Sequence, residues 1–504
     1  MSLAIAYSRG RDGVKAPLIT VEVHLSNGLP GLSIVGLPEA AVKESKDRVR
    51  GALLNSRFNF PQKRITINLA PADIPKEGGR FDLAIALGIL AASEQIPKQA
   101  LADYECVGEL SLGGELRPIN GVLPVALQTL AANKPLILPA DNVQEASLVS
   151  NLQLVPVPHL LDICAHLNGQ STITSFTTEP FGDTTDYPHD FADVRGQHHV
   201  KRAMEIAAAG MHNILMLGPP GTGKSMLASR LPTILPPLTE QQALESAAIA
   251  SISEGGFVTE NWRKPPFRAP HHTASAPALV GGGSNPKPGE ISLAHNGALF
   301  LDELPEFDRK VLEVLREPLE TGHISISRAS RQANFPARFQ LIAAMNPCPC
   351  GYLGDSSGRC RCTSEQVARY RARVSGPLLD RIDMHLEVPR VSHDMLRHDS
   401  TTVEEKSATI RQRIIQARNI ANNRADKVNA LLTTKDIKQY CALSEAGYQI
   451  LEQAMNKFGL SNRAYHRILK LARTIADLAD AQDIDIQHLS EAISYRKLDR
   501  SVLQ

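Results

Sequence analysis

The most constraining feature of the chain is the glycine-rich segment GPPGTGKS at residues 218–225. It fits the pattern G-x-x-x-x-G-K-[ST] at every fixed position. The apolar run Ile214–Leu217 precedes it and predicts a buried strand, and residues 226–231 follow with the composition of a helix. In this context backbone N–H groups can close around phosphates, and the helix N-terminus favours bound anions. The segment therefore predicts a nucleotide phosphate site, the alternative being a glycine-rich loop without a ligand.

The loop residues have separate predicted roles. Lys224 would contact the β- and γ-phosphates, and the hydroxyl of Ser225 would coordinate Mg²⁺. The residues predicted to bind nucleotide are Gly218, Pro219, Pro220, Gly221, Thr222, Gly223, Lys224 and Ser225.

Two further apolar runs end on polar residues that could complete this site. The strand predicted at 297–301 is followed by Asp302 and Glu303, and the strand Phe339–Met345 by Asn346. Asp302 is predicted to hold Mg²⁺, directly or through water, and Glu303 to orient and deprotonate the attacking water. Asn346 is predicted to lie near the γ-phosphate, a role compatible with capping the following turn.

Composition limits the class of protein without identifying a partner. Fifty-four basic and 53 acidic residues give a formal charge of +1, which neither supports nor excludes nucleic acid. Hydrophobic residues make up 43% of the 504 residues, as in globular proteins. The N-terminus lacks a signal-peptide h-region, and no run is long enough to span a membrane. We therefore expect a soluble, cytoplasmic protein.

Residues 1–168 predict an α+β unit, and the polar segment 169–190 predicts a linker. Leu18–Leu25 alternates as a strand does, and a turn at 26–28 leads to a predicted partner strand at Leu32–Val35. Pro38 opens a predicted helix that runs to Asn55, and a further strand is predicted at Arg64–Leu69.

Two motifs in this unit resemble the Lon-protease-type domain. They are Pro75–Gly79 with Phe81–Leu83, and Gly108–Gly114 with Leu116–Ile119. The protease carries a serine and a lysine at the positions that align with Arg80 and Leu123 here. Without nucleophile or base, we expect the fold without proteolysis. The resemblance implies a role in ring formation and DNA contact, as in DNA-processing ATPases with such inactive domains.

From residue 191 onward the order of motifs resembles the AAA+ ATPase superfamily, which implies ATP as the nucleotide. Arg381, just before the predicted strand Met384–Val388, matches the arginine finger that acts on a neighbour's nucleotide. Arg463 matches the sensor-2 arginine of the helical lid, with Arg467 as the alternative. Either arginine could instead lie on the surface or form an internal ion pair. An arginine acting on a neighbour implies a homo-oligomeric ring, here a hexamer.

The segment between the first strands of this part resembles the magnesium-chelatase-like group, which has an insert in the second AAA+ helix. It runs from Phe267 to Ala276, through the glycines at 281–283, to Pro288–Gly297. A hairpin is predicted from Gly322 through Arg328, returning through Arg331. In ring translocases of this branch both elements face the central pore. The predicted DNA contacts are Arg268, His271, His272, Arg328 and Arg331, although exposed arginines are commonly only solvated.

With the Lon-like unit in front and a helical lid behind, the whole chain resembles the ComM/YifB family of magnesium-chelatase-like AAA+ ATPases. We expect a multidomain α/β protein divided into 1–168, a linker at 169–190, an ATPase core at 191–395 and a lid at 396–504. The resemblance implies a hexameric, ATP-dependent DNA helicase that promotes branch migration in natural transformation or recombination. It would act on single-stranded, duplex or branched DNA.

Four of the seven cysteines, Cys348, Cys350, Cys360 and Cys362, form a C-x-C-x₉-C-x-C pattern. Four thiolates over this span can hold a structural Zn²⁺ ion, although the C-x-C spacing is tighter than usual. Free thiols and an iron–sulfur cluster are the alternatives. The loop begins two residues after Asn346, so a bound zinc would stiffen the segment beside the γ-phosphate.

Two other functional classes stay open at this stage. One is a chelatase-type motor subunit that remodels a protein partner, against which the Lon-like unit argues. The other is a nucleotide-switched DNA-binding protein with little turnover, against which Asp302, Glu303 and Arg381 argue.

Overall fold

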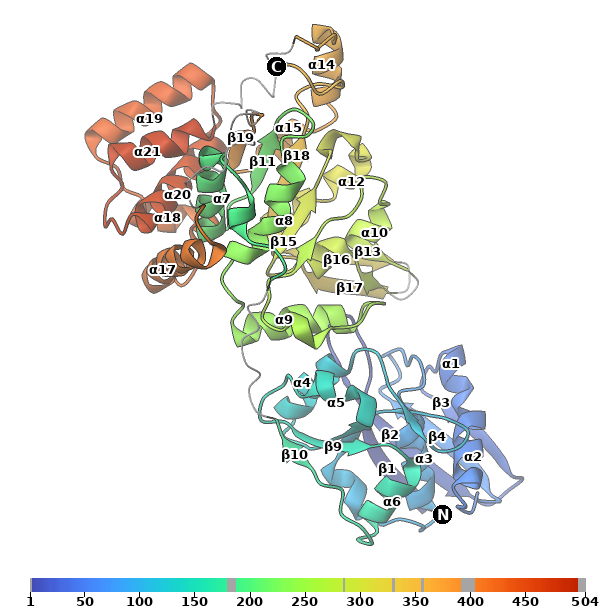
Figure 1. Cartoon of the computed structure of the whole chain (residues 1–504). Coiled ribbons are helices and arrows are strands. Elements are labelled where there is room, and N and C mark those ends of the chain that lie inside the picture. Colours follow the sequence, from blue (N-terminus) through green and yellow to red (C-terminus); the bar gives the residue numbers. More distant parts are fainter. Residues whose placement is uncertain are drawn as a thin grey trace.

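The computed structural model describes residues 2–178, 187–283, 286–328, 331–354, 358–390 and 404–496. Within these ranges the chain forms an N-terminal unit of two main sheets, a central unit around a parallel sheet, and a C-terminal group of helices (Figure 1). The mixed α/β class predicted from the sequence is confirmed.

The first N-terminal sheet buries one face against a helix. Its strands are, in spatial order, β1 (Ser2–Arg9), β2 (Leu18–Ser26), β4 (Arg64–Ala70) and β3 (Gly31–Val35). Alternate residues of β2 and β4 are buried, as expected for a sheet with one covered face. The cover is α3 (Asp82–Ala92), in which every residue is buried and which packs on β1 and β2. Burial of each large side chain of α3 contributes about 1.5–3 kcal/mol.

The predicted pairing of Leu32–Val35 with Leu18–Leu25 is wrong. The segment forms β3, which pairs in parallel with β4 and not with β2. Both edges of β2 are occupied, by β1 over eight residue pairs and by β4 over seven. The N-terminal strand β1, which the sequence reasoning missed, therefore takes the position expected for β3. The helix predicted from Pro38 to Asn55 forms as α1 (Ala40–Lys43) and α2 (Ser45–Asn55).

A second sheet completes the N-terminal unit. Its strands are, in spatial order, β10 (Phe176–Thr177), β9 (Gln153–Val157), β8 (Leu136–Pro139) and β5 (Glu105–Cys106). β10 lies inside the segment predicted as a linker and pairs with β9. Two helices of this unit are α4 (Val122–Ala131) and α6 (Leu160–Leu167).

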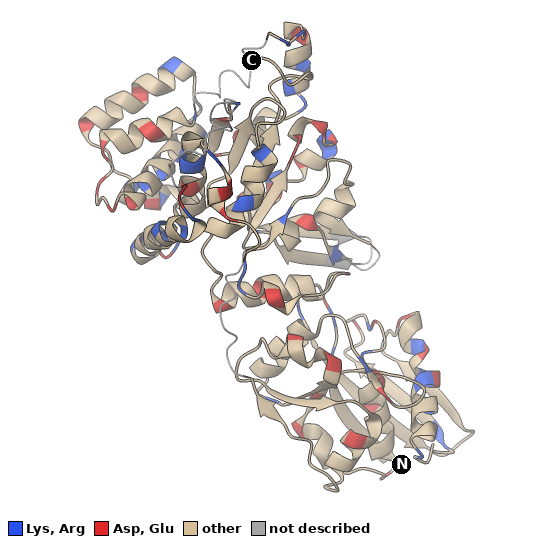
Figure 2. Cartoon of the chain, viewed as in Figure 1, with Lys and Arg blue, Asp and Glu red and all other residues tan. Residues whose placement is uncertain are grey.

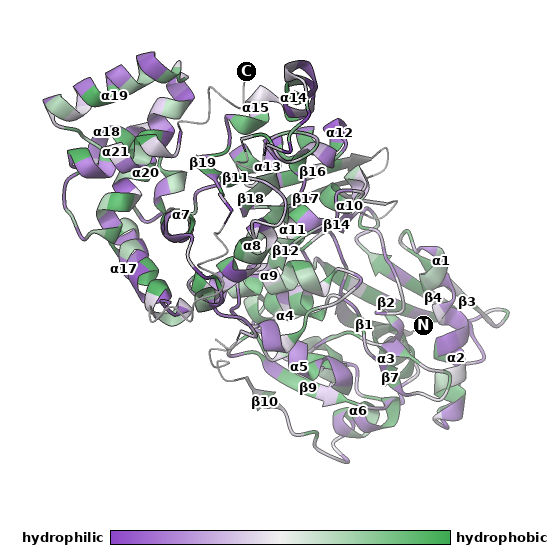
Figure 3. Ribbon diagram, turned by 45° about the horizontal axis from the view of Figure 1, so that its top comes forward, coloured by the Kyte–Doolittle hydropathy of each residue, from purple (hydrophilic) through white to green (hydrophobic). Residues whose placement is uncertain are grey.

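The central unit is built on a five-stranded parallel sheet. Its strands are, in spatial order, β12 (Phe267–Arg268), β15 (Ala298–Leu301), β18 (Gln340–Met345), β11 (Ile214–Leu217) and β19 (Met384–Glu387). Every residue of β15, β18 and β11 is buried, which explains their nearly continuous apolar sequences (Figure 3). The strands predicted before the glycine-rich loop, before Asp302 and before Asn346, and the strand predicted at Met384–Val388, are all present in one sheet.

Helices and smaller sheets surround this sheet. α7 (His198–Gly210) precedes β11, and α8 (Lys224–Ile234) follows the glycine-rich loop. The insert contains α10 (Ala276–Val280), β13 (Gly281–Gly282), β14 (Lys287–Pro288) and α11 (Glu290–Leu293). The predicted hairpin is present as β16 (His323–Arg328) and β17 (Arg331–Pro336), in which Arg328 pairs with Arg331. The short helices around it are α12 (Arg309–Glu313), α13 (Arg316–Thr321), α14 (Ser364–Arg371) and α15 (Gly376–Leu379).

The C-terminal helices share a core with the central unit. They are α17 (Ser407–Ala425), α18 (Thr434–Tyr440), α19 (Glu445–Phe458), α20 (Asn462–Leu478) and α21 (Ile486–Ser494). α17 and α20 pack on α7, and one apolar cluster runs from β11 through α7 into these helices. The C-terminal helices are therefore packed against the sheet through α7.

The N-terminal unit contacts the central unit through α9 (Glu240–Ser251) (Figure 1). Ala243 and Ala247 of α9 join Trp262 and residues of α4, such as Val122, in one buried apolar cluster. Ser150 donates a hydrogen bond to Glu240 at 2.9 Å at the rim of this contact. The contact is therefore mainly apolar, although basic and acidic residues are interspersed over both units (Figure 2).

Candidate nucleotide site

Three strand ends bring the predicted ATP-site residues together. β15, β18 and β11 are parallel neighbours, so the segments that follow them meet at one edge of the sheet. The hydroxyl of Ser225 donates to Asp302 Oδ2 at 2.5 Å, and Lys224 Nζ donates to Asn346 Oδ1 at 3.3 Å. Residues that are more than 70 positions apart in the sequence thus converge at the carboxyl ends of adjacent strands.

The glycine-rich loop has the backbone shape that its sequence requires. Gly221 (φ 78°) and Gly223 (φ 84°) are both left-handed, a conformation in which glycine carries no Cβ penalty. Lys224 opens α8, and its ammonium group donates to Gly218 O at 2.8 Å and to Pro219 O at 3.0 Å. Burial lowers the pKa of Lys224. A cation folded onto carbonyl oxygens at an open helix N-terminus is suited to receive phosphate oxygens.

The donors expected to hold Mg²⁺ fit that ion. Ser225 and Asp302 supply a hydroxyl and a carboxylate oxygen in direct contact, and oxygen ligands are what Mg²⁺ prefers. The backbone N–H of Glu303 donates to Asp302 Oδ1 at 2.9 Å, which fixes the orientation of the Asp302 carboxylate. One or two carboxylates with substrate phosphates and waters are typical of such sites.

Glu303 has a partner that the sequence reasoning assigned elsewhere. Its backbone is left-handed (φ 51°), and its Oε2 lies 3.1 Å from Nδ1 of His272. The ring of His272 is also in T-shaped contact with Phe307, with ring centroids 6.5 Å apart. It lies tilted against the ring of His271, at a centroid distance of 4.1 Å. His272, predicted to contact DNA, therefore lies beside the predicted catalytic carboxylate. No local sequence pattern signals this contact, because it joins the insert to the end of β15.

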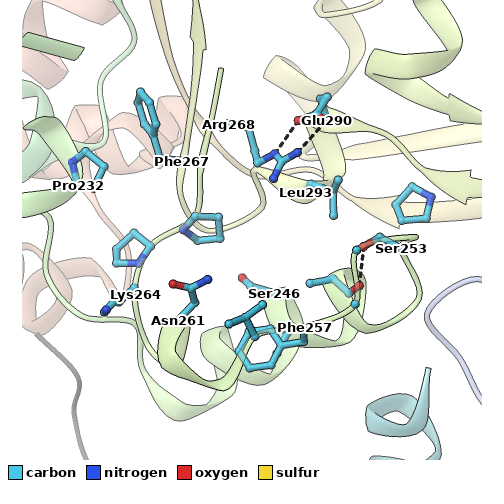
Figure 4. Close-up of a pocket in the computed structure, with 18 of the residues that line it drawn as sticks. Pro232, Ser246, Ser253, Phe257, Asn261, Lys264, Phe267, Arg268, Glu290 and Leu293 are labelled. Carbon is cyan, nitrogen blue, oxygen red and sulfur yellow. Dashed lines mark hydrogen bonds and ion pairs between the residues drawn. The ribbon is translucent and has the colours of Figure 1, made fainter. Parts of the chain in front are cut away.

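The other predicted DNA contacts have different surroundings. Arg268 forms a bidentate pair with Glu290 at 2.6 and 2.7 Å, in the wall of a cavity of about 1040 Å³ (Figure 4). The Glu290 carboxylate raises the pKa of Arg268 and balances its charge locally. His271 is exposed, and its Nδ1 lies 2.9 Å from Thr273 Oγ1. The side chains of Arg328 and Arg331 lie outside the part of the chain that the structure describes.

Arg381 and Arg463 line one cavity of about 670 Å³ between α13 and α20. Glu320 binds the guanidinium of Arg381, and its Oε1 lies 3.9 Å from Nη2 of Arg463. The described lining of this cavity includes no residue of the glycine-rich loop. The two arginines are therefore neighbours of each other in one subunit.

Arg467, the alternative to Arg463, has a structural partner. It binds the carboxylate of buried Asp383 and donates to Arg381 O at 2.8 Å. Its guanidinium is thus engaged at the junction of lid and sheet, whereas the side chain of Arg463 is 59% exposed. This difference favours Arg463 as the arginine available to a nucleotide.

The four predicted zinc ligands form one cluster. The Sγ atoms of Cys348, Cys350, Cys360 and Cys362 all lie within 4.8 Å of one another. Three Sγ separations are 3.4, 3.8 and 3.7 Å, against about 3.8 Å for sulfurs around tetrahedral zinc with Zn–S bonds of about 2.3 Å. The backbone N–H of Tyr352 lowers the pKa of Cys350 to about 6, whereas the pKa values of Cys360 and Cys362 are raised beside it, as in a cluster of thiols that shares one thiolate. The donor set therefore fits zinc.

The N-terminal unit offers no serine–lysine pair at the positions that align with the protease. Arg80 is buried and donates to Asn120 O at 2.9 Å, and burial lowers its pKa to about 10. Leu123 is fully buried in α4. The Lon-like assignment itself stays a prediction.

Three family models of magnesium-chelatase domains match successive parts of the chain. "Subunit ChlI of Mg-chelatase" matches residues 21–142, "Magnesium chelatase, subunit ChlI" residues 190–396, and "Magnesium chelatase, subunit ChlI C-terminal" residues 404–496. Competence protein ComM of Haemophilus influenzae is 53% identical, over 99% of this chain and 98% of its own length. The YifB proteins of Salmonella typhimurium and Escherichia coli are 51% and 50% identical, each over 100% of this chain and 99% of their own lengths.

The chain belongs to the ComM/YifB family of magnesium-chelatase-like proteins. The family resemblance expected from the motifs is thereby confirmed. Among the described residues, no helix is long and apolar enough to cross a membrane.

Proposed function

We propose that the protein is an ATPase whose hydrolytic site lies at the carboxyl ends of β11, β15 and β18. The observation that carries the proposal is the contact of Ser225 with Asp302 and of Lys224 with Asn346 at that edge. Phosphate-binding, metal-binding and water-positioning groups are all present there, on the first turn of α8 and directly after β15 and β18. Membership of a family with magnesium-chelatase ATPase domains supports the same conclusion.

The residues divide the reaction between them. Lys224 exchanges its carbonyl partners for phosphate oxygens, while Asn346 holds the attacking water. Glu303 accepts a proton from that water as its oxygen bonds to the γ-phosphorus and the bond to the ADP oxygen breaks. Mg²⁺, when bound by Ser225 and Asp302, neutralises charge on the phosphates.

We further propose that Arg381 and Arg463 serve the nucleotide of a neighbouring subunit in a hexameric ring. Glu320 gathers both arginines at one cavity whose described lining excludes the glycine-rich loop. A head-to-tail interface would bring that cavity against the neighbour's phosphates, as closed rings require. Phosphate oxygens would then replace Glu320 as the partner of the two guanidinium groups.

The proposed substrate of the motor is DNA, and the proposed pathway is competence or recombination. Support comes from the 53% identity to a protein named for competence and from the presence of the insert and the hairpin. The contact of His272 with Glu303 links that insert to the hydrolytic residue. A chelatase-type motor acting on a protein partner, and a DNA-binding switch with little turnover, remain the competing functions.

DNA-stimulated ATPase activity separates the three functions. A DNA motor hydrolyses ATP faster with single-stranded, duplex or branched DNA, whereas a protein-remodelling motor responds to none of them. A switch binds DNA without sustained turnover. The Glu303→Gln variant should bind ATP and hydrolyse it at a rate lower by about 10²–10⁴-fold. Normal turnover by this variant would exclude Glu303 as the base.

A further inference from the structure

The cysteine loop, residues 346–362, contacts the glycine-rich loop directly. Gly351, one residue after Cys350, is buried and left-handed (φ 83°). A Cβ atom at this position would lie 2.7 Å from Cδ and 3.2 Å from Cγ of Pro220, and 3.8 Å from Cγ of Asn346. The backbone of the cysteine loop therefore packs directly against the ring of Pro220. The space between them is too small for a Cβ atom at position 351.

A second path joins the two loops indirectly, through Arg390 and Gln197. The ring of Tyr352 lies 4.6 Å from the guanidinium carbon of Arg359 and 5.5 Å from that of Arg390. Arg390 directly follows Pro389, whose carbonyl accepts from Gln197 at 3.5 Å, and Gln197 also donates to Thr222 O at 2.8 Å. The cysteine loop thus adjoins two segments that hold the phosphate-binding backbone.

Arg371 of α14 also donates to Pro347 O at 3.3 Å, but the cysteine loop has few apolar side chains of its own. Between Asn346 and Thr363, Leu353 and Tyr352 are the large apolar residues of its sequence, and Leu353 is 36% exposed. Such a segment cannot form its own core, so its fold depends on the four-sulfur cluster. A cross-link there would hold Gly351 against Pro220, and losing it would let both loops relax.

We infer that the four-cysteine metal site positions the nucleotide site, with Gly351 as the positioning residue that transmits metal occupancy to Pro220. The inference rests on the proposed zinc and nucleotide binding, and on neither DNA nor ring formation. Because coupling between two ligands is reciprocal, bound nucleotide must also raise the affinity of the four cysteines for the metal.

The loop supplies a matched pair of variants. Gly354 has nearly the same backbone conformation as Gly351, with φ 80° against 83°, but a Cβ there would meet nothing within 4 Å. Gly351→Ala and Gly354→Ala therefore share the cost of a left-handed alanine and differ in the contact with Pro220. Fluorescent mant-ADP with Mg²⁺, titrated into the full-length chain, should bind about tenfold more weakly to Gly351→Ala than to Gly354→Ala. Equal affinities would overturn the inference.

A second measurement takes its main readout from the wild-type chain, so that readout does not depend on how a variant folds. Removing zinc with a chelator should weaken mant-ADP binding, and restoring Zn²⁺ should recover it. Saturating Mg-ADP should raise the affinity for zinc, measured at equilibrium by competition with the chelator, by the same factor in the wild type, and not in Lys224→Ala. Unchanged affinity after zinc removal, or a wild-type chain that binds no zinc, overturns the coupling and leaves the ATPase proposal intact. A wild-type chain that binds no nucleotide overturns both.

Discussion

Replacing Arg381 by alanine should abolish hydrolysis in a neighbouring subunit while leaving the variant's own nucleotide binding intact. An arginine that reaches the transferred phosphate from a neighbour typically contributes about 10³-fold or more to kcat. The Arg381 side chain is 7% exposed and donates to Pro377 O at 2.6 Å as well as binding Glu320, so its removal also costs packing and hydrogen bonds. Urea unfolding of the variant, measured beside its kcat, separates this structural cost from the loss of catalysis. The expected result is a steep loss of kcat with a nearly unchanged Kd for ATP.

Complementation tests the direction of action. Glu303→Gln and Arg381→Ala chains should each be inactive alone, but in a mixed ring some interfaces join the intact Glu303 of one chain to the intact Arg381 of the next. Random mixing of equal amounts makes about one quarter of the interfaces functional. ATPase activity of co-expressed, doubly tagged rings should therefore rise far above that of either variant. The control is Arg373→Ala, since Arg373 forms an exposed pair with Glu306 at 2.8 Å. If mixed rings are no more active than the single variants, Arg381 does not act on a neighbour.

Three further predictions concern the metal, the lid and pH. Replacing Cys348 and Cys360 by serine should remove bound zinc, measured by atomic absorption after gel filtration; full retention would exclude these ligands. Asp477→Ala should destabilise the fold by about 3–5 kcal/mol, because it leaves buried Arg473 and the bidentate Arg424 without their carboxylate partner; a urea unfolding midpoint equal to that of the wild type would contradict this. Burial lowers the pKa of His212 from 6.5 to about 4, so the folded state resists its protonation. The resulting stability is present above pH 6.5 and falls by about 3 kcal/mol as pH drops to 4. In His212→Gln this part of the acid dependence should disappear, since Nε2 of His212 otherwise serves mainly to bind Thr474 at 2.7 Å.

The pairing of β3 shows where sequence reasoning reached its limit for the fold. The alternation in Leu18–Leu25 predicted a strand, and β2 is there. Which strand lies beside it was decided by competition for its two edges, and β1 and β4 offer longer complementary pairings than the five residues of β3. Local pattern fixes the existence of a strand, whereas its neighbours depend on every other strand in the unit.

The nucleotide site likewise has a part that the sequence predicted and a part that only the folded chain reveals. The sequence by itself determined the glycine-rich loop and the polar residues at the ends of apolar runs, because parallel strands deliver their following residues to one edge. Only the tertiary structure brought His272 to Glu303, gathered Arg381 and Arg463 at Glu320, and set Gly351 against Pro220. These contacts join segments with no shared periodicity or spacing, and they arise from how the insert, the lid and the cysteine loop pack on the sheet. Local motifs can be identified from the sequence, whereas the contacts that couple one motif to another form only when the chain folds.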